Sequence, residues 1–219
     1  MCGEHVGGKC AVSTRHGVFI TLEGGEGVGK STAALRLTAL LREAGHEVVA
    51  TREPGGTPGA EAIRALLLNA DTELTAMAQT MLHFAARADH VARVIRPALA
   101  RGAVVICDRY SDSTMAYQAY GMGVEIGAVA ALTRLIGLTP DITFMLEVPE
   151  FVSKLRLNLR GEASDRYERM DAEVMARIAQ GFRAIAAAEP ARCVVLDGTA
   201  PPAEVAARMR GIIQARTGR

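Results

Sequence analysis

The feature that most constrains this chain is the segment "EGGEGVGKST", residues 23–32. It contains the pattern Gly-x-x-x-x-Gly-Lys-Ser, directly after an apolar run and directly before a stretch with helical spacing. In that context the pattern is typical of a P-loop, in which consecutive backbone N–H groups and a helix N-terminus hold phosphate. A chance glycine-rich turn rarely has both the spacing and the flanking elements. The chain is therefore predicted to bind a nucleotide within an α/β fold.

Short apolar runs alternate along the chain with longer stretches of helical spacing. The predicted strands are 18–23, 47–52, 103–108, 142–147 and 193–197. The predicted helices are about 30–44, 71–101, 124–137, 150–160, 171–188 and 202–215. Buried strands that alternate with helices are typical of a parallel sheet covered on both faces. We predict one domain over residues 17–219 with a five-stranded parallel sheet, and a flexible extension over residues 1–16.

The composition argues against several classes of partner. With 25 Lys and Arg against 24 Asp and Glu, the formal charge is +1, so the chain lacks the basic surplus typical of proteins that bind nucleic-acid polymers. Hydrophobic residues make up 49% of the chain but never form the run of about 18 that a membrane span needs. Residues 1–17 lack the apolar stretch of a signal peptide. We expect a cytoplasmic protein without a membrane partner.

The four cysteines fit that compartment. Cys107 and Cys193 lie in predicted strands and are expected to be reduced. Cys2, His5 and Cys10 could ligate a metal, but their spacing matches no common zinc pattern. A loose tail without a metal is the favoured interpretation of the first residues.

The predicted helix 71–101 is apolar around much of its circumference. Pro97 is expected to kink its last turn. Two interpretations stay open for this helix: it is deeply buried within the domain, or it contacts a second copy of the chain. One face carries apolar residues at helical spacing, namely Leu74, Met77, Met81, Ala85, Ala88, Ala92, Ile95 and Leu99.

The predicted P-loop assigns roles to its own residues. Lys30 supplies a mobile positive charge, and the Ser31 hydroxyl can ligate Mg²⁺. Glu26 is unexpected, because a carboxylate in the middle of the loop should repel the phosphates that the loop holds. The predicted ATP-binding residues are Gly24, Gly25, Glu26, Gly27, Val28, Gly29, Lys30, Ser31 and Thr32.

Three classes of P-loop protein compete at this point. A GTPase normally needs an Asn-Lys-x-Asp motif, which does not occur in the sequence. A motor or transport ATPase usually ends its metal-binding strand in Asp-Glu, whereas the run "AVVICDRY" ends in Asp-Arg. A small-molecule kinase needs arginines in loops at the carboxyl ends of strands, to hold a second phosphate-bearing substrate. Such arginines follow the second, third and fourth predicted strands, so a kinase is favoured.

Taken together, these segments resemble the bacterial thymidylate kinase family over residues 17–216. The resemblance rests on an ordered set of motifs: "EGGEGVGKST", "TREPGGT", "HFAAR", "DRYSDSTMAYQ", "RGEASDRYE" and "LDGTAP". The first motif alone occurs in many kinases, whereas the ordered set is specific to this family. The resemblance implies the nucleoside-monophosphate-kinase fold, transfer of the γ-phosphoryl group of ATP to dTMP with Mg²⁺, and a homodimer.

The resemblance also implies an acceptor site. Arg52 and Arg109 match contacts to the dTMP phosphate, and Arg87 matches the position that hydrogen-bonds thymine. The family often stacks a phenylalanine on the base four residues before that arginine. This chain has His83 there, followed by Phe84, and either ring could stack. The implied dTMP-binding residues are Glu26, Arg52, Pro54, His83, Phe84, Arg87, Arg109, Ser113, Thr114, Tyr117 and Gln118.

Further roles follow from the same resemblance. Asp108 matches a carboxylate near Mg²⁺, so the implied metal ligands are Ser31 and Asp108. Residues 154–169 are expected to form a lid whose arginines close on ATP. An acidic residue at the position of Glu26 lies near the 3′-hydroxyl of dTMP in the family, and the competing interpretation is a solvent-facing or Lys-paired residue. The implied catalytic residues are Lys30, Glu26, Arg109, Arg160 and Arg166.

Structural alternatives exist for these assignments. Arg52 and Arg109 could simply pair with nearby acidic residues, Arg87 could be a surface charge, and Tyr117 could be an ordinary core residue. The charges of the expected lid could form a solvated helix face. A cis peptide bond before Pro54 is possible, because cis X–Pro bonds cost little. The alternative functions are another nucleoside monophosphate or deoxynucleoside kinase and, less favoured, a P-loop regulator without transfer.

Overall fold

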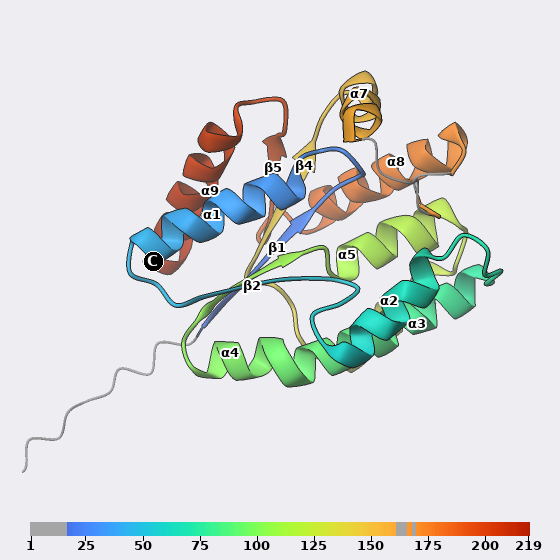
Figure 1. The fold of residues 1–219 in the computed structure, drawn as a ribbon, viewed down its shortest axis with the longest axis horizontal. Helices are drawn as coiled ribbons and strands as arrows, with labels where there is room; N and C mark the ends of the chain where they lie inside the picture. Colours follow the sequence, from blue (N-terminus) through green and yellow to red (C-terminus); the bar gives the residue numbers. More distant parts are fainter. Residues whose placement is uncertain (1–16, 161–165, 168–169) are drawn as a thin grey trace, which may run out of the picture.

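The computed structural model describes residues 17–160, 166–167 and 170–219. At its centre is a five-stranded sheet in the order β2-β3-β1-β4-β5, and every neighbouring pair is parallel (Figure 1). The predicted parallel sheet is confirmed, and each strand begins and ends within one residue of its predicted bounds. The strands are β1 (Val18–Glu23), β2 (Val48–Arg52), β3 (Val104–Asp108), β4 (Ile142–Glu147) and β5 (Cys193–Asp197).

Alternate residues of the strands face two layers of helices, because successive side chains of a strand point to opposite sides. On one face, α1 (Lys30–Glu43) and α9 (Pro202–Thr217) pack against each other and against the sheet (Figure 1). Residues from both helices and from the inner strands form a single buried cluster. Its members include Ile20, Leu22, Leu37, Leu41, Ile106, Phe144 and Met209.

The other face is covered by helices from the middle of the chain and by α8 (Ala172–Ala188). Phe19 and Val105 pack there against Ile95, and Met145 packs in a second cluster with Phe182. The prediction of helices on both faces of the sheet is therefore confirmed. Within the described residues, no helix combines the length and the apolar character that crossing a membrane requires.

The predicted helix 71–101 consists of three segments: α3 (Ala76–His90), the π-helical η1 (Val91–Ile95) and α4 (Arg96–Ala100). It begins later than predicted because Thr75 is its N-cap, and the Thr75 hydroxyl accepts a hydrogen bond from the Ala78 N–H at 3.2 Å. Pro97 lies in the first turn of α4, directly after the wider π-helical turn. The π-helical turn η1 thus lies just N-terminal to Pro97. In a regular α-helix the proline ring would clash there with a backbone carbonyl group of the preceding turn.

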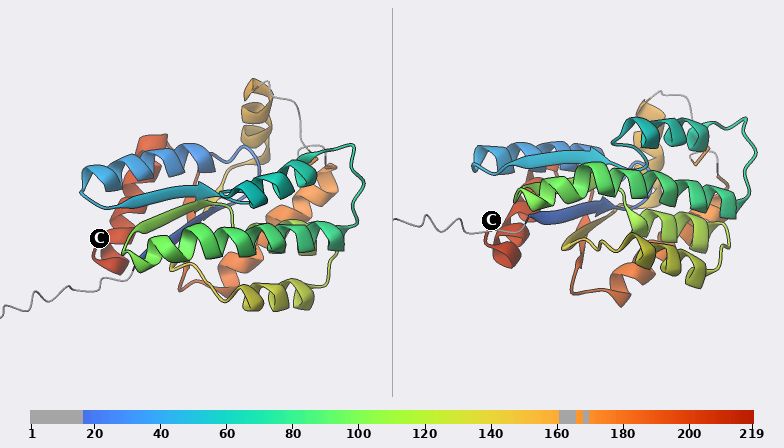
Figure 2. Two further views of the ribbon diagram at one scale, coloured as in Figure 1. Left: turned by 60° about the horizontal axis from the view of Figure 1, so that its bottom comes forward. Right: turned by 90° about the horizontal axis from the view of Figure 1, so that it is seen from below.

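One face of α3 is open to solvent. Met77 is 43% exposed and Met81 is 59% exposed, and Ala85, Ala88 and Ala92 continue the same exposed stripe. The interpretation of a deeply buried helix is therefore wrong for this face. Figure 2 shows α3 between α2 (Pro58–Leu68) and α6 (Ile126–Ile136). Both α2 and α6 also carry exposed leucine or isoleucine side chains.

Two helical segments have no counterpart in the sequence analysis. The sequence does contain a helix-start signal for α2. Thr57 is the N-cap, its hydroxyl accepts a hydrogen bond from the Ala60 N–H, and Pro58 is the first helical residue. The other segment is α5 (Ser111–Thr114), which continues as the π-helical η2 (Met115–Gly121). Irregular helices of this kind are difficult to recognise from periodicity, and they are frequent at functional sites.

The remaining helix, α7 (Glu150–Arg160), matches its prediction and leads into the expected lid. Of that lid, residues 161–165 and 168–169 lie outside the described residues. The predicted extension over residues 1–16, with Cys2, His5 and Cys10, also lies outside them.

Candidate active site

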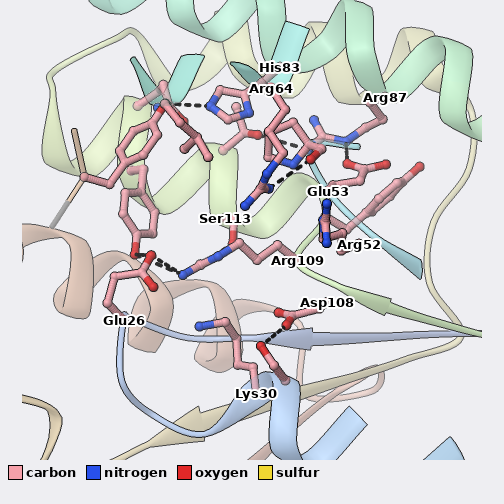
Figure 3. A pocket seen from close by; sticks show the side chains of 18 of the residues that line it. Glu26, Lys30, Arg52, Glu53, Arg64, His83, Arg87, Asp108, Arg109 and Ser113 are labelled. Carbon is pink, nitrogen blue, oxygen red and sulfur yellow. Dashed lines mark hydrogen bonds and ion pairs between the residues drawn. The ribbon is translucent and has the colours of Figure 1, made fainter. Parts of the chain in front are cut away.

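A pocket opens at the carboxyl ends of β1, β2 and β3, which is where ligands bind in parallel α/β sheets. Figure 3 shows its side chains, with His83 and Arg87 at one end and Glu26 and Lys30 at the other. The pocket is lined by residues of the P-loop, of the turn after β2, of α2 and α3, of the turn after β3 and η2, and by Tyr167. The structure therefore brings together segments that are up to 140 residues apart.

The P-loop adopts a conformation that only glycine tolerates at two positions. Gly24 has φ 131°, and a Cβ atom there would lie 2.4 Å from the Leu146 carbonyl oxygen. Gly27 has φ 70°, and a Cβ atom would lie 2.7 Å from the Ser153 carbonyl oxygen. Both positions combine the left-handed region with close backbone approach. The predicted glycine pattern thus has a direct steric cause.

Helix α1 starts at this loop with a bare N-terminus. Gly29 is its N-cap and has no side chain to satisfy the first N–H groups, so these donors are available to an anion. Lys30 folds back over the loop, and its Nζ donates to the Gly25 carbonyl oxygen at 2.6 Å. Burial lowers the pKa of Lys30 to about 8, and the positive charge of nearby Arg109 acts in the same direction. A phosphate group would restore the full charge by replacing the lost solvation.

Two oxygen-bearing side chains meet beside the helix N-terminus. The Ser31 hydroxyl donates to Oδ2 of Asp108 at 2.6 Å (Figure 3). The second carboxylate oxygen, Oδ1, is buried and has no hydrogen-bond partner among the described residues. A hydroxyl beside an incompletely satisfied carboxylate fits the oxygen ligands that Mg²⁺ prefers. Ser31 and Asp108 are therefore able to hold that ion.

The carboxylate of Glu26 is paired within the pocket. One of its oxygens accepts hydrogen bonds from Nη2 of Arg109 and, at 3.1 Å, from the Tyr117 hydroxyl. The guanidinium group of Arg109 also lies over the Tyr117 ring, 5.2 Å from its centre. Glu26 is thus only 19% exposed and is paired with an arginine, whereas the competing interpretation expected solvent or a lysine as its partner. Its negative charge is balanced by Arg109, which follows β3.

Arg109 is held in an unusual conformation by buried partners. Its φ is 70°, the only positive value at a non-glycine residue in the described part of the chain. The backbone N–H of Arg109 donates to the Leu22 carbonyl oxygen at 3.0 Å, and the next N–H, of Tyr110, donates to Glu23 at 2.7 Å. The other Glu23 oxygen accepts from Ser113, whose hydroxyl oxygen accepts in turn from Nη1 of Arg109 at 3.0 Å. Glu23 therefore anchors both the backbone and the side chain of this turn.

Glu23 itself is completely buried. Burial raises the pKa of its carboxyl group to about 7, and the nearby charge of Asp112 acts in the same direction. The sequence analysis did not single out this residue, because it reads as the last position of an apolar strand.

Arg87 is a buried arginine with a donor left over. Its Nε donates to Glu53 at 2.7 Å, and its Nη2 donates to the Thr114 hydroxyl at 3.1 Å. The third nitrogen, Nη1, is buried without a hydrogen-bond partner among the described residues. Only 2% of Arg87 is exposed, so the alternative of a surface charge does not hold. An uncompensated buried donor is costly unless a ligand meets it.

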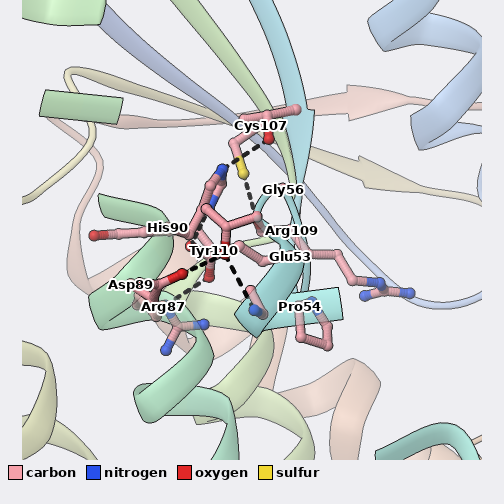
Figure 4. A network of polar contacts seen from close by, with 12 residues as sticks. Glu53, Pro54, Gly56, Arg87, Asp89, His90, Cys107, Arg109 and Tyr110 are labelled. Carbon is pink, nitrogen blue, oxygen red and sulfur yellow. Dashed lines mark hydrogen bonds and ion pairs between the residues drawn. The ribbon is translucent and has the colours of Figure 1, made fainter. Parts of the chain in front are cut away.

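A polar network supports Arg87 from behind (Figure 4). The second Glu53 oxygen lies 2.9 Å from Nδ1 of His90, and Nε2 of His90 lies 2.7 Å from the Thr51 hydroxyl. The Glu53–Pro54 bond is cis, which confirms the conformation that the sequence allowed. This network joins β2, the following turn and α3, so it fixes the side of the pocket that carries Arg87.

The two candidate stacking rings have different surroundings. Phe84 packs into a core cluster with Ala119 and Val129, beneath the guanidinium group of Arg87. His83 lines the pocket, and its Nε2 lies 2.8 Å from the Tyr167 hydroxyl. Burial lowers the pKa of His83 to about 3, with Arg87 contributing, so this ring is neutral at physiological pH. The structure therefore brings His83 to the pocket wall and packs Phe84 into the core.

The other implied acceptor residues are distributed around the same pocket. Pro54, Ser113, Thr114, Tyr117 and Gln118 all line it. Arg52 also lines it, but its Nη2 is paired with Glu61 at 3.2 Å on the exposed side. That ion pair is accessible to solvent, so an incoming phosphate could exchange with Glu61.

Of the two implied lid arginines, the structure describes the side chain of Arg166 alone. Arg160 ends α7, and its side chain lies outside the described part of the structure. Arg166 donates to the carbonyl oxygens of Asn69, at 2.6 Å, and Thr72, in the loop between α2 and α3. Another arginine of α7, Arg156, reaches the P-loop region instead, with its guanidinium group 3.4 Å from the Gly27 carbonyl oxygen and 3.0 Å from that of Gly198.

Several residues in or beside the pocket were missed by the sequence analysis as site residues. Glu53, Arg64 and Tyr167 line the pocket, whereas Glu23 and Arg156 contact the turn after β3 and the P-loop from outside it. No local pattern marks them, since tertiary contacts place them.

Comparisons with known proteins agree with this geometry. A family model described as thymidylate kinase matches residues 22–209. The chain is 48% identical over 206 residues to a thymidylate kinase of Gluconobacter oxydans, which covers 92% of this chain and 96% of that protein. It is 46% identical to one of Caulobacter vibrioides, covering 92% and 98%. A crystal structure of thymidylate kinase from Ehrlichia chaffeensis superposes with a TM-score of 0.76 at 32% identity, covering 91% of this chain and 99% of that one. The chain therefore belongs to the thymidylate kinase family.

Proposed function

We propose that this protein transfers the γ-phosphoryl group of ATP to dTMP, giving dTDP, with Mg²⁺. The observation that carries the proposal is one continuous pocket with a phosphate-binding loop at one end and, at the other, a buried arginine donor that has no hydrogen-bond partner in the described part of the chain. A regulator that only binds nucleotide has no need of this second, costly recognition site.

The donor end would hold the phosphates of ATP through the P-loop N–H groups, the N-terminus of α1 and Lys30. Ser31 and Asp108 would hold Mg²⁺, which neutralises negative charge on the phosphates when it is bound. The pairing of Ser31 with Asp108 keeps both oxygens on the same side of the loop.

The acceptor end selects a base through Arg87. A guanidinium group can only donate hydrogen bonds. Its Nη1, which no described residue meets, therefore fits a base with a carbonyl oxygen on the facing edge, as thymine has. Cytosine presents an amino group at that place, which is a donor, and should be rejected. Arg52 and Arg109 would hold the phosphate of the acceptor, after Arg52 exchanges its exposed partner Glu61.

The chemistry then consists of positioning. The attacking oxygen already belongs to a phosphate dianion, so the protein need not remove a proton from it. Lys30 and Arg109 hold the two phosphates in line and neutralise their charge, while the closed pocket excludes water. The Glu26–Arg109 pair keeps the carboxylate from repelling the phosphates, and the carboxylate would accept a hydrogen bond from the 3′-hydroxyl of the sugar.

Two further elements belong to this proposal. Arg160 and Arg166 would contact the transferring group, and Arg166 would first have to leave the α2–α3 loop, to which it is bonded in this structure. The exposed apolar stripe of α3 would be covered by a second copy of the chain in a homodimer.

A coupled assay with ATP and Mg²⁺ against a panel of nucleoside monophosphates tests the function. We expect dTMP to be phosphorylated with the highest kcat/KM, and CMP and AMP to be poor acceptors. The panel includes dUMP, which presents the same carbonyl edge as dTMP. A preference for CMP or AMP would indicate another nucleoside monophosphate kinase, and transfer to none of the acceptors would favour a regulator.

A further inference from the structure

Two side chains of the pocket wall come from distant parts of the chain. His83 lies on α3, and Tyr167 follows α7 in the sequence. The Nε2 atom of His83 and the Tyr167 hydroxyl oxygen are 2.8 Å apart, and both residues line the pocket that contains Arg87 and Tyr117. Tyr167 is buried, with 7% of its surface exposed.

Tyr167 also contacts the part of the wall nearer to the P-loop. Its ring meets the Tyr117 ring edge-on, with the ring centres 5.6 Å apart and the planes at 90°. The Tyr117 hydroxyl donates to Glu26 at 3.1 Å. A chain of contacts therefore runs from His83 through Tyr167 and Tyr117 to Glu26, along one side of the pocket.

The position of His83 relates it to the acceptor base. It precedes Arg87 by one helical turn, so the two side chains project from the same side of α3. A base that meets the free donor of Arg87 would therefore lie beside the His83 ring. Because the His83 ring is neutral, it can pack against a base without the desolvation cost that a charged imidazolium would have.

We propose that Tyr167 is a positioning residue for acceptor recognition. Its hydroxyl holds the His83 ring in the orientation that forms the wall of the base site, so the ring loses little freedom when dTMP binds. The inference rests on the proposed function, because it takes dTMP as the acceptor. It adds Tyr167, which lies near the end of the expected lid segment 154–169, to the residues that determine acceptor affinity.

A double-mutant cycle measures this contact directly. Binding of dTMP is followed by calorimetry without ATP, in the wild type, Y167F, H83F and the double variant. Tyr167→Phe keeps the ring contact with Tyr117 and removes only the hydroxyl. We expect Y167F to weaken dTMP binding about 5-fold, as the loss of one hydrogen bond does. In the H83F background the same change should weaken dTMP binding clearly less, because the contact with His83 is already absent, whereas the contact of the hydroxyl with Gln79 Oε1, at 3.4 Å, is lost in both backgrounds.

Two controls separate positioning from support of the fold. Y120F removes the hydroxyl of a tyrosine that lines a different pocket, and it should bind dTMP like the wild type. ATP affinity should stay unchanged in Y167F. An equal loss in both backgrounds, or equal losses for dTMP and ATP, would overturn the inference.

The same experiment distinguishes failure of this inference from failure of the proposed function. If the wild type itself does not bind dTMP, the proposed function and the inference fall together. If the wild type binds dTMP and Y167F binds it equally well, the function stands and the role of Tyr167 is refuted.

Discussion

At the scale of single residues, Glu26 is already neutralised before any nucleotide arrives. The carboxylate in the P-loop meets Arg109 and Tyr117, so the conflict with phosphate that its position suggested is removed by a partner 83 residues away. In the proposed function, the same carboxylate contacts the sugar 3′-hydroxyl of dTMP. Both parts of this arrangement can be tested with one isosteric change.

Glu26→Gln is expected to lower kcat with dTMP while ATP affinity survives, because the P-loop keeps its shape and loses only one charge. A 3′-deoxy analogue of dTMP should be a poor substrate already for the wild type and should lose little more in E26Q. Steady-state kinetics with both acceptors checks this expectation. Equal losses for the two acceptors would show that Glu26 does not contact the sugar.

Glu23 offers a second prediction at this scale, through pH. Its pKa is about 7 in the folded protein and ordinary in the unfolded chain, so folding favours the protonated form. The contribution of this group to stability is therefore greatest below about pH 4.5 and falls as pH rises toward 7. Glu23→Gln cannot titrate. Urea unfolding at pH 5 and pH 8 should show E23Q gaining stability relative to the wild type at the higher pH.

The catalytic consequence of E23Q follows from the contacts of Arg109. Without the carboxylate, Tyr110 and Ser113 lose a charged acceptor, and the left-handed turn at Arg109 loses its anchor. We expect kcat/KM for dTMP to fall more than ATP affinity. An unchanged stability difference between the two pH values would contradict the buried, titrating carboxyl group.

At the scale of elements, α7 and the segment after it carry the arginines of the expected lid. Arg160→Ala and Arg166→Ala should each lower kcat, and at least one of them by about 100-fold if it acts on the transferring phosphoryl group. Thermal unfolding should change little in that variant. If R166A instead loses stability and keeps its kcat, its bonds to the α2–α3 loop are its main role.

At the scale of the whole molecule, the exposed stripe on α3 predicts an assembly. The wild type should sediment at twice the 23.2 kDa mass of one chain. Met81→Asp places a charge where apolar surface would be buried, so M81D should shift the protein toward the monomer. Leu35→Asp is the matched control, because Leu35 is exposed on α1, on the opposite face of the sheet. A monomeric wild type would refute the proposed dimer.

The sequence by itself determined the features that depend on local patterns. Apolar runs gave all five strands within one residue, and the glycine spacing of the P-loop followed from the backbone conformations that phosphate binding demands. The family was also recognisable, because its motifs are short, contiguous and ordered. Periodicity could not find η2, whose wider turns depart from the regular helical repeat.

Only the tertiary structure decided how distant residues share charge and hydrogen bonds. Whether Arg87 lies on the surface or in the pocket depends on Glu53 and Thr114, which no local pattern links to it. Which of His83 and Phe84 lines the pocket depends on which side of α3 faces the core. The partners of Glu26 and Tyr167 likewise come from other elements, since side-chain pairing is a property of the packed fold and leaves no periodic signal in the sequence.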